Sequence, residues 1–553
     1  MIDQRRRPLA VVTGTVAVIT LLAIGCTREP EPSPPPSSPV ATTPGSGLNG
    51  TTIPSGAGEP SNAPAGLRFG LENEPGSLDP VSHVFDRSTF QVARAVFDPL
   101  MAYDERLDLQ PVLAESVTAS EDLRTWTMKV RPGVRFHDNR PFDAAVVADM
   151  LDRARGSQTF ARDLSLIANV EAVERHTVVV QMREPWSTFP HVLAGQLGMV
   201  AVAPRGDAGT APTADIMVGT GPFRLDAWER GRHLRVVRSP DYWRGIPAKS
   251  DVLTFRFVTD ATARSSMVAA GELDVAQFDE PLPMASGAAA AKQGRVVLEA
   301  DAEGETPELV LALATDRAPF DDPTARAALA HAIDRDALSR RVFNGQYPPA
   351  EGPFSEGSRW FGQAQWPVRD PSTAKEELAR RTDPTKPLRF ELMVEDSAIN
   401  RRLVQELEFQ LQEIGIGVSP RWVTGPELRA RVADWRFVAA LVPLFGGQHP
   451  DEDHVTLHSR ADGVGPNSAW IDDALTKARA TSDVTAQAEQ FRIIQEQLAS
   501  QLPFVFLVRM RDNLVAAPAV SGLAESTLPN GRPGLPQLRG TVALENIAVA
   551  TAP

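Results

Sequence analysis

The stretch that most constrains the fold is residues 219–245, GTGPFRLDAWERGRHLRVVRSPDYWRG. Its opening GTGP predicts a turn, because glycine accepts a positive φ and proline fixes φ and lacks an amide hydrogen. Apolar and polar residues then alternate with a period of two, from Phe223 and again from Leu234, which is typical of half-buried strands. The sequence ERGR at 229–232 predicts the turn between the two runs. By these patterns the stretch is a β-hairpin with an aromatic pair, YW, at its exit.

The order of residues in this hairpin also resembles the signature hairpin of family 5 extracellular solute-binding proteins, the peptide- and nickel-binding receptors of ABC importers. Further motifs of that family follow in order, at 74–80 (EPGSLDP), 97–100 (FDPL), 131–141 (RPGVRFHDNRP), 271–274 (GELD) and 319–335 (PFDDPTARAALAHAIDR). Asn139 replaces a usual glycine, and asparagine tolerates a left-handed turn. Asp143 replaces a usual threonine and is expected to cap the following helix. The resemblance covers nearly everything from Leu67 onward.

The resemblance implies an α/β fold of the type II periplasmic-binding-protein kind, a Venus flytrap of two lobes with an extra appended domain. Carried onto this chain, it predicts domain I at 67–107, 218–311 and 513–548, domain II at 108–217, and domain III at 312–512. Two crossing segments, near 311–315 and near 508–513, would form a hinge between the lobes. Closure about such a hinge traps a ligand when the closed form binds it more tightly.

The N-terminus predicts export and lipid anchoring. Arg5–Arg7 precede an apolar run, Leu9–Ile24, which has the length of a signal-peptide core and is short for a bilayer span. The run ends in LAIGC, which resembles a bacterial lipobox, where the thiol of Cys26 accepts a diacylglyceryl group. Residues 1–26 are therefore predicted to be a lipoprotein signal peptide, and the Pro/Ser-rich residues 27–66 a disordered tether. We expect a protein anchored on the extracytoplasmic face of the cell membrane.

Composition and missing motifs exclude several functions. The formal net charge of −14 argues against a nucleic-acid partner, because phosphate binding needs a concentrated basic surface. The chain has no GxSxG elbow, no GxxxxGK[ST] loop and no HExxH motif, and its single cysteine is assigned to lipidation. We therefore expect a monomeric binding protein with no enzymatic activity and no cofactor.

Two segments are predicted to face the ligand. Members of the family place the residues just after LDP against the ligand, which here implies Phe85 and Asp86. The opposite wall is expected from residues 445–453, FGGQHPDED, and its candidates are Phe445, Gln448, His449 and Asp451.

Gln448 stands where an aspartate pairs with the α-amino group in peptide-binding members of the family. A neutral amide can accept a hydrogen bond from an ammonium group but cannot neutralise it, and a buried unpaired charge is costly. Anchoring of a peptide by its amine is therefore in doubt unless Asp451 or Asp86 takes that role.

A metal site is the alternative for the same loop. His454 and His458 are four residues apart, so both could face one metal on a helix, and His449 lies nearby. Clustered histidines on a polar loop are otherwise ordinary surface residues. Nickel-chelate receptors of the family use a histidine in this neighbourhood.

The sequence thus predicts the binding subunit of an ABC importer, which captures a peptide or peptide-like solute and delivers it to a permease and ATPase complex. One alternative is a nickel or metallophore receptor. Another is an envelope lipoprotein that keeps the fold but serves as a scaffold or regulator, because Ala314 and Gln448 replace an asparagine and an aspartate common in the family.

Overall fold

The computed structural model describes residues 66–203, 217–278, 296–299, 306–459 and 468–550. The predicted signal peptide and all but the last residue of the predicted tether lie outside these ranges. Within them, no helix combines the length and the apolar character that a membrane span requires.

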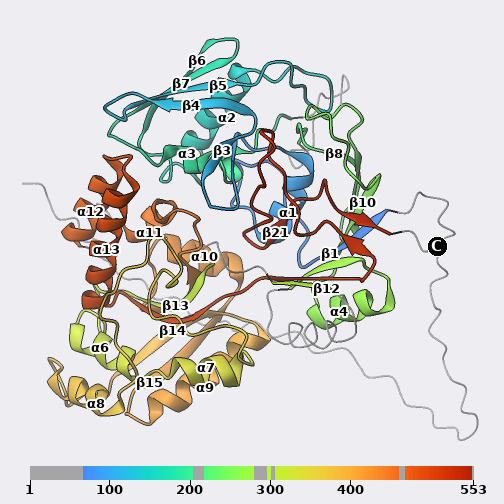
Figure 1. The fold of residues 1–553 in the computed structure, drawn as a ribbon. Helices are drawn as coiled ribbons and strands as arrows, with labels where there is room; N and C mark the ends of the chain where they lie inside the picture. Colours follow the sequence, from blue (N-terminus) through green and yellow to red (C-terminus); the bar gives the residue numbers. More distant parts are fainter. Residues whose placement is uncertain (1–65, 204–216, 279–295, 300–305, 460–467, 551–553) are drawn as a thin grey trace, which may run out of the picture. The chain divides into compact units, whose positions relative to one another are not determined.

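Three larger sheets and three small strand pairs build the described chain (Figure 1). The seven-stranded sheet has the order β12 (Val296–Glu299), β18 (Asn513–Ala516), β11 (Val275–Phe278), β1 (Leu67–Leu71), β10 (Val252–Phe257), β9 (His233–Arg238) and β8 (Phe223–Glu229). The five-stranded sheet has the order β15 (Gly417–Val423), β14 (Arg389–Glu395), β16 (Ala439–Leu444), β13 (Glu308–Leu313) and β17 (Phe504–Arg509). The four-stranded sheet has the order β4 (Ala114–Ala119), β5 (Thr125–Val130), β7 (Thr177–Met182) and β6 (Ile167–Glu174). The pairs are β2 (Met101–Tyr103) with β3 (Leu109–Pro111), β19 (Val520–Ser521) with β22 (Ala548–Val549), and β20 (Gln537–Leu538) with β21 (Thr541–Val542).

Helices cover these sheets and connect their strands. The described helices are α1 (Arg87–Val96), α2 (Ala144–Gly156), α3 (Phe189–Val192), η1 (Gln196–Gly198), α4 (Ala261–Ala270), α6 (Pro323–Ala332), α7 (Arg335–Val342), α8 (Pro371–Arg380), α9 (Ala398–Gln412), α10 (Gly425–Ala433), η2 (Pro450–Asp453), α11 (His454–Leu457), α12 (Ala469–Arg479) and α13 (Val484–Gln501).

The predicted hairpin is confirmed as β8 and β9, which pair antiparallel in the seven-stranded sheet. Phe223, Leu234 and Val236 are buried, whereas Arg224 and Asp226 on the other face are exposed. This alternation places one face of the hairpin on the core that β1 and β10 also build.

The five-stranded sheet contains a β-α-β unit. Strands β14 and β15 pair in parallel and α9 joins them, with Leu403, Leu407 and Leu411 buried on its inner face. Gly415 ends the connection at a φ of 87°, which glycine adopts without strain. All six residues of β13 are buried, as expected for a strand in the middle of a sheet covered on both faces.

The chain passes twice between the seven-stranded and five-stranded sheets. One passage lies between β12 and β13, and the other is residues 510–512, between β17 and β18. The second agrees with the predicted crossing near 508–513. The first lies earlier than the predicted 311–315, because β13 already pairs within the five-stranded sheet from Glu308. The three-domain division stays a prediction, and its boundary at residue 311 falls inside β13.

The four-stranded sheet packs against α2, which begins as the sequence indicated. The carboxylate of Asp143 accepts hydrogen bonds from the amides of Ala145 and Val146, so it is the predicted N-cap. Asn139 adopts a φ of 67°, the predicted left-handed turn. Both departures from the family pattern are therefore compatible with the local backbone.

Helix α1 ends before the FDPL motif. The helix spans Arg87–Val96, and Phe97 leaves it in an extended conformation, so that the FDPL motif forms a bend into β2. Pro99 favours this ending because the residue before a proline is disfavoured in the helical conformation.

The hairpin packs its opening turn against this bend. A Cβ added at Gly219 would lie 2.0 Å from the carbonyl oxygen of Val96, and one at Gly221 would lie 2.6 Å from the Val96 carbonyl carbon. Neither glycine has a positive φ. The two glycines are therefore required by close approach of two backbones, and the expectation of a positive φ at the turn was wrong.

Candidate functional site

Residues 445–453 follow β16 and form the most strongly buried polar segment among the predicted site residues. Phe445, the first of them, has a φ of 62° and packs its ring at 5.3 Å from Phe504 and 5.4 Å from Phe506. Its side chain is 2% exposed, so Phe445 belongs to the core beneath the loop. Gln448 is buried as well.

His449 is positioned by its own backbone. Its Nδ1 accepts the amide hydrogen of Asp451, and its amide donates to the Glu452 carboxylate at 3.1 Å, which completes a capping box at the start of η2. The ring is 2% exposed. Burial disfavours the charged imidazolium and lowers the pKa of His449 to about 3. This imidazole is therefore neutral at physiological pH.

Three aromatic rings contact His449 and a fourth, Tyr103, contacts His191; together with His449 they form what we term the ring cluster. Its members are Tyr103, His191, Trp360, His449 and Phe491. The ring centroids of His449 lie 4.3 Å from His191, 4.7 Å from Trp360 and 5.7 Å from Phe491. Tyr103 completes the cluster through its hydroxyl, 2.9 Å from Nδ1 of His191. The cluster joins β2 and α3 to residues of the predicted domain III.

The cluster holds its titratable groups in their neutral forms. Burial lowers the pKa of His191 well below its ordinary value, and the neighbouring His449 adds to that shift. Burial likewise raises the pKa of Tyr103, with Glu452 contributing. Tyr103, Trp360, His449 and Phe491 are buried, so the ring cluster is an uncharged aromatic core that gives a cationic group no counter-charge.

Asp451 is fully engaged by neighbours. Its Oδ2 accepts from the Trp186 indole at 3.0 Å and from the Thr188 hydroxyl, and its Oδ1 accepts from Nε of Arg479 at 2.7 Å. Asp451 and Arg479 are both buried. The carboxylate thus links the loop between β7 and α3 to α12, and both its oxygens already accept hydrogen bonds.

Glu452 joins three separate segments. Its carboxylate accepts from the Tyr103 hydroxyl at 3.1 Å and from Arg539 at 2.7 Å, besides the amide of His449. Two carboxylates of this loop are therefore each matched by an arginine: Asp451 by Arg479, and Glu452 by Arg539.

Phe85 and Asp86 lie at the N-terminal end of α1. The Phe85 amide donates to Gln196 at 2.8 Å, and its buried ring has an edge contact with His83. Asp86 is the N-cap of α1, where its Oδ1 accepts from the Thr89 amide, and its side chain is exposed. None of these contacts reaches residues 445–453, so the structure does not bring the two predicted walls into direct contact.

The three histidines of the metal alternative make different contacts. Nδ1 of His454 lies 2.8 Å from the Asp451 carbonyl oxygen, and burial lowers the pKa of His454 to about 4. His458 is exposed and pairs with Asp472 at 3.4 Å. Among the described residues, no three His, Cys, Asp or Glu side chains gather as a metal site would require.

The sequence did not point to most partners of this loop, namely Tyr103, Trp186, Thr188, His191, Arg479 and Arg539. They come from β2, the loop between β7 and α3, α3 itself, α12 and the C-terminal segment, and none belongs to a motif with fixed spacing.

Comparison with known proteins identifies the family of this chain. Residues 108–464 match the model of the bacterial extracellular solute-binding proteins, family 5. The chain belongs to this family. Its members are the binding components of ABC importers and are not enzymes.

Curated relatives of this solute-binding protein align over most of its length. The glutathione-binding protein GsiB of Pectobacterium atrosepticum is 28% identical over 472 residues, covering 79% of this chain and 87% of the relative. GsiB of Salmonella paratyphi A is 30% identical over 470 residues, covering 78% and 86%.

Solved structures show the same fold. The binding protein AgaA from A. tumefaciens R10, in complex with agropinic acid, superposes with a TM-score of 0.75 at 23% identity, covering 88% of this chain and 99% of that one. A dipeptide-binding protein from Pseudoalteromonas, in complex with Met-Leu, gives 0.74 at 22% identity, covering 88% and 100%. The solute-binding protein therefore has the predicted type II periplasmic-binding-protein fold.

Proposed function

We propose that this solute-binding protein captures a peptide or peptide-like solute and delivers it to an ABC permease and ATPase complex. The observation that carries the proposal is the family match over residues 108–464. The names of the GsiB relatives, which bind glutathione, favour a peptide-like solute.

The acidic residues of the two predicted walls differ in whether their charge is already matched. Asp451 and Glu452 each have an arginine partner, so neither supplies a spare negative charge. Asp86 is exposed and uses one carboxylate oxygen for its cap, which leaves the other for a ligand. We infer that Asp86 anchors a cationic group of the solute.

A binding screen tests this proposal. Unfolding of the full-length chain is followed with glutathione, with dipeptides to pentapeptides and with Ni(II)-histidine chelates. A solute at a hundredfold excess over its dissociation constant should add about 2.7 kcal/mol to the free energy of unfolding. Stabilisation by the chelates alone would favour the metallophore receptor, and no stabilisation by any solute would favour the scaffold.

Asp86→Asn separates ligand anchoring from helix capping. Asparagine is as good an N-cap as aspartate, so the variant keeps α1 and loses only the charge. The matched control is Asp260→Asn, because Asp260 is likewise exposed and caps α4 through the Ala263 amide at 2.6 Å. We expect D86N to bind peptide at least tenfold more weakly than the wild type, and the control to bind it with unchanged affinity. Equal affinities of the two variants would exclude Asp86 as the anchor.

Anchoring through a lipid on Cys26 is the second part of the proposal. It is supported by the arginines, the apolar run and the LAIGC sequence at the N-terminus. Cys26→Ser should move the protein from the membrane to the soluble fraction of expressing cells. Retention of the variant in the membrane fraction would contradict lipid anchoring.

A further inference from the structure

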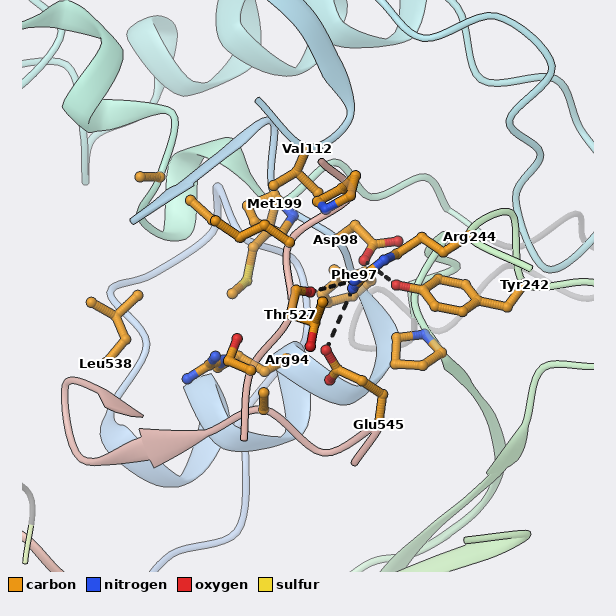
Figure 2. Close-up of a pocket in the computed structure, with 18 of the residues that line it drawn as sticks. Arg94, Phe97, Asp98, Val112, Met199, Tyr242, Arg244, Thr527, Leu538 and Glu545 are labelled. Carbon is orange, nitrogen blue, oxygen red and sulfur yellow. Dashed lines mark hydrogen bonds and ion pairs between the residues drawn. The ribbon is translucent and has the colours of Figure 1, made fainter. Parts of the chain in front are cut away.

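A cavity lies apart from residues 445–453 and the ring cluster. It has a volume of about 90 Å³, is partly open, and is lined mainly by residues of α1, the exit of the signature hairpin and the segment from Ser526 to Glu545. Figure 2 shows Arg94, Asp98, Arg244 and Glu545 among its lining residues. None of the lining residues belongs to the ring cluster or contacts Asp451. A cavity of this size with polar walls can hold a small polar molecule.

Four charged side chains line the cavity, and two of them, Arg244 and Glu545, form an ion pair. Glu545 pairs with Arg244 at 3.4 Å, and Arg244 also donates to the Thr527 carbonyl oxygen. Asp98 accepts from Tyr242, Trp243 and Thr220. Arg94, in contrast, has no carboxylate within ion-pair distance in the described part of the chain.

Arg94 uses only one of its three guanidinium nitrogens. Nη1 donates to the carbonyl oxygen of Thr541 at 2.8 Å and to its hydroxyl at 3.2 Å. Nε and Nη2 have no hydrogen-bond partner among the described residues, and neither is among the fully buried unpaired side-chain atoms. The side chain keeps part of its accessible surface, yet burial lowers the pKa of Arg94 to about 10. Arg94 is also one of the residues that line the cavity.

The unused edge of Arg94 has the geometry that an oxyanion takes. Nε and Nη2 point their hydrogens in the same direction, and two such parallel bonds are the usual side-on contact of arginine with a carboxylate. The same chain makes this contact elsewhere, where Arg68 donates from Nε at 3.0 Å and from Nη2 at 2.7 Å to Asp274. Burying this cation is costly, and Glu545, whose charge raises the pKa of Arg94, lies beyond ion-pair distance from it, so an anion bound here would stabilise the fold.

We propose that the Nε and Nη2 edge of Arg94 binds a small oxyanion, with two oxygen atoms on the two nitrogens, in the cavity between α1 and residues 526–545. A free carboxylate such as acetate and an inorganic oxyanion such as phosphate share this chemistry. The bound anion neutralises Arg94 and thereby stabilises the contact between α1 and the C-terminal segment.

The test measures the melting temperature of the full-length chain in acetate, phosphate and chloride at equal ionic strength. Acetate or phosphate, or both, should raise it above the value in chloride, and which of the two does so identifies the class of anion. Arg94→Gln, which keeps a donor for Thr541 and lacks the paired edge, should lose this increase. The exposed Arg340→Gln is the matched control and should keep it, as should D86N in the proposed solute site. No increase in the wild-type protein, or an equal increase in R94Q, would overturn the proposal.

A second measurement uses the wild-type protein and so does not depend on whether R94Q folds. Crystals of the wild-type protein are soaked in bromoacetate or selenate, and anomalous density is located. Density within hydrogen-bond distance of Nε and Nη2 of Arg94 supports the proposal, and its absence at saturating concentration overturns it.

Arg94→Lys keeps the charge without the paired edge, so it should bind acetate or phosphate at least tenfold more weakly than the wild type.

Discussion

The hydroxyl of Tyr242 donates a hydrogen bond of 2.8 Å to Oδ1 of Asp98, and both side chains are buried. Trp243 and Thr220 donate to Oδ2 of the same carboxylate at 2.7 and 3.1 Å. Asp98 belongs to the FDPL motif, and its three donors belong to the two ends of the signature hairpin. Three motifs that are far apart in the sequence thus share one buried carboxylate.

Tyr242→Phe should destabilise the protein because it removes a donor from this carboxylate while leaving the ring in place. The expected loss in the free energy of unfolding is about 1–3 kcal/mol, the range for a hydrogen bond to a buried charged group. Chemical denaturation measures it. Thr118→Val, which removes a partly exposed hydroxyl on β4, should change stability by less than about 0.5 kcal/mol. Equal effects of the two variants would contradict a structural role for the Tyr242 hydroxyl.

Asp98 should also make stability fall as pH rises. Burial raises the pKa of Asp98 from 3.8 to about 6, more than its donors lower it. Between pH 4 and 6 the folded state holds a proton that the unfolded state has released. The contribution of Asp98 to the free energy of unfolding is therefore most favourable below pH 4, and it falls by about 1.4 kcal/mol per pH unit up to pH 6. Asp163 has a pKa raised by burial in the same way. The difference between the wild type and Asp98→Asn isolates Asp98, and a difference that stays constant from pH 4 to 6 would contradict the prediction.

His449 should act in the opposite direction. Its pKa is lowered from 6.5 to about 3 by burial, so the unfolded state takes up a proton first as pH falls. The stabilising contribution is complete above pH 6.5 and decreases by about 1.4 kcal/mol per pH unit toward pH 3. His449→Asn keeps an acceptor for the Asp451 amide and removes the titration. Its stability, measured against the wild type by urea denaturation, should therefore decline less between pH 6.5 and 4.5; parallel curves would show that His449 does not titrate in this way.

Asp451→Asn should cost about 3–5 kcal/mol of stability, because it leaves the buried Arg479 without its carboxylate. Combining it with Arg479→Met should recover part of the loss, since the unmatched charge is then gone. Denaturation curves of both variants and of R479M form a double-mutant cycle. A double variant as unstable as the sum of the two single ones would argue against coupling between Asp451 and Arg479.

Gly219→Ala should destabilise by more than about 3 kcal/mol, because the new Cβ would lie 2.0 Å from the Val96 carbonyl oxygen and 2.4 Å from the Phe97 ring. Gly156→Ala at the end of α2 is the control, since nothing lies within 4 Å of its Cβ position. Alanine there should be neutral or slightly stabilising by its helix propensity. Melting temperatures of the two variants decide whether close approach is the reason for glycine at 219.

The sequence by itself determined the local structure and the family. Periodicity of two predicted the hairpin, the turn and cap preferences of Asn139 and Asp143 predicted their conformations, and ordered motifs indicated the fold. These features can be predicted because they depend on the conformational preferences of residues that are close together in the chain.

Tertiary structure alone decided the roles of the polar residues. Asp451, a candidate for holding a ligand, pairs with Arg479 and Trp186, and the glycines of the GTGP turn are needed for contact with Val96. The edge of Arg94 left open beside Thr541 is equally invisible in the sequence. The physical reason is that a hydrogen bond or ion pair acts over a few ångströms and depends on which distant segments the fold brings together, a property that no spacing along the chain specifies.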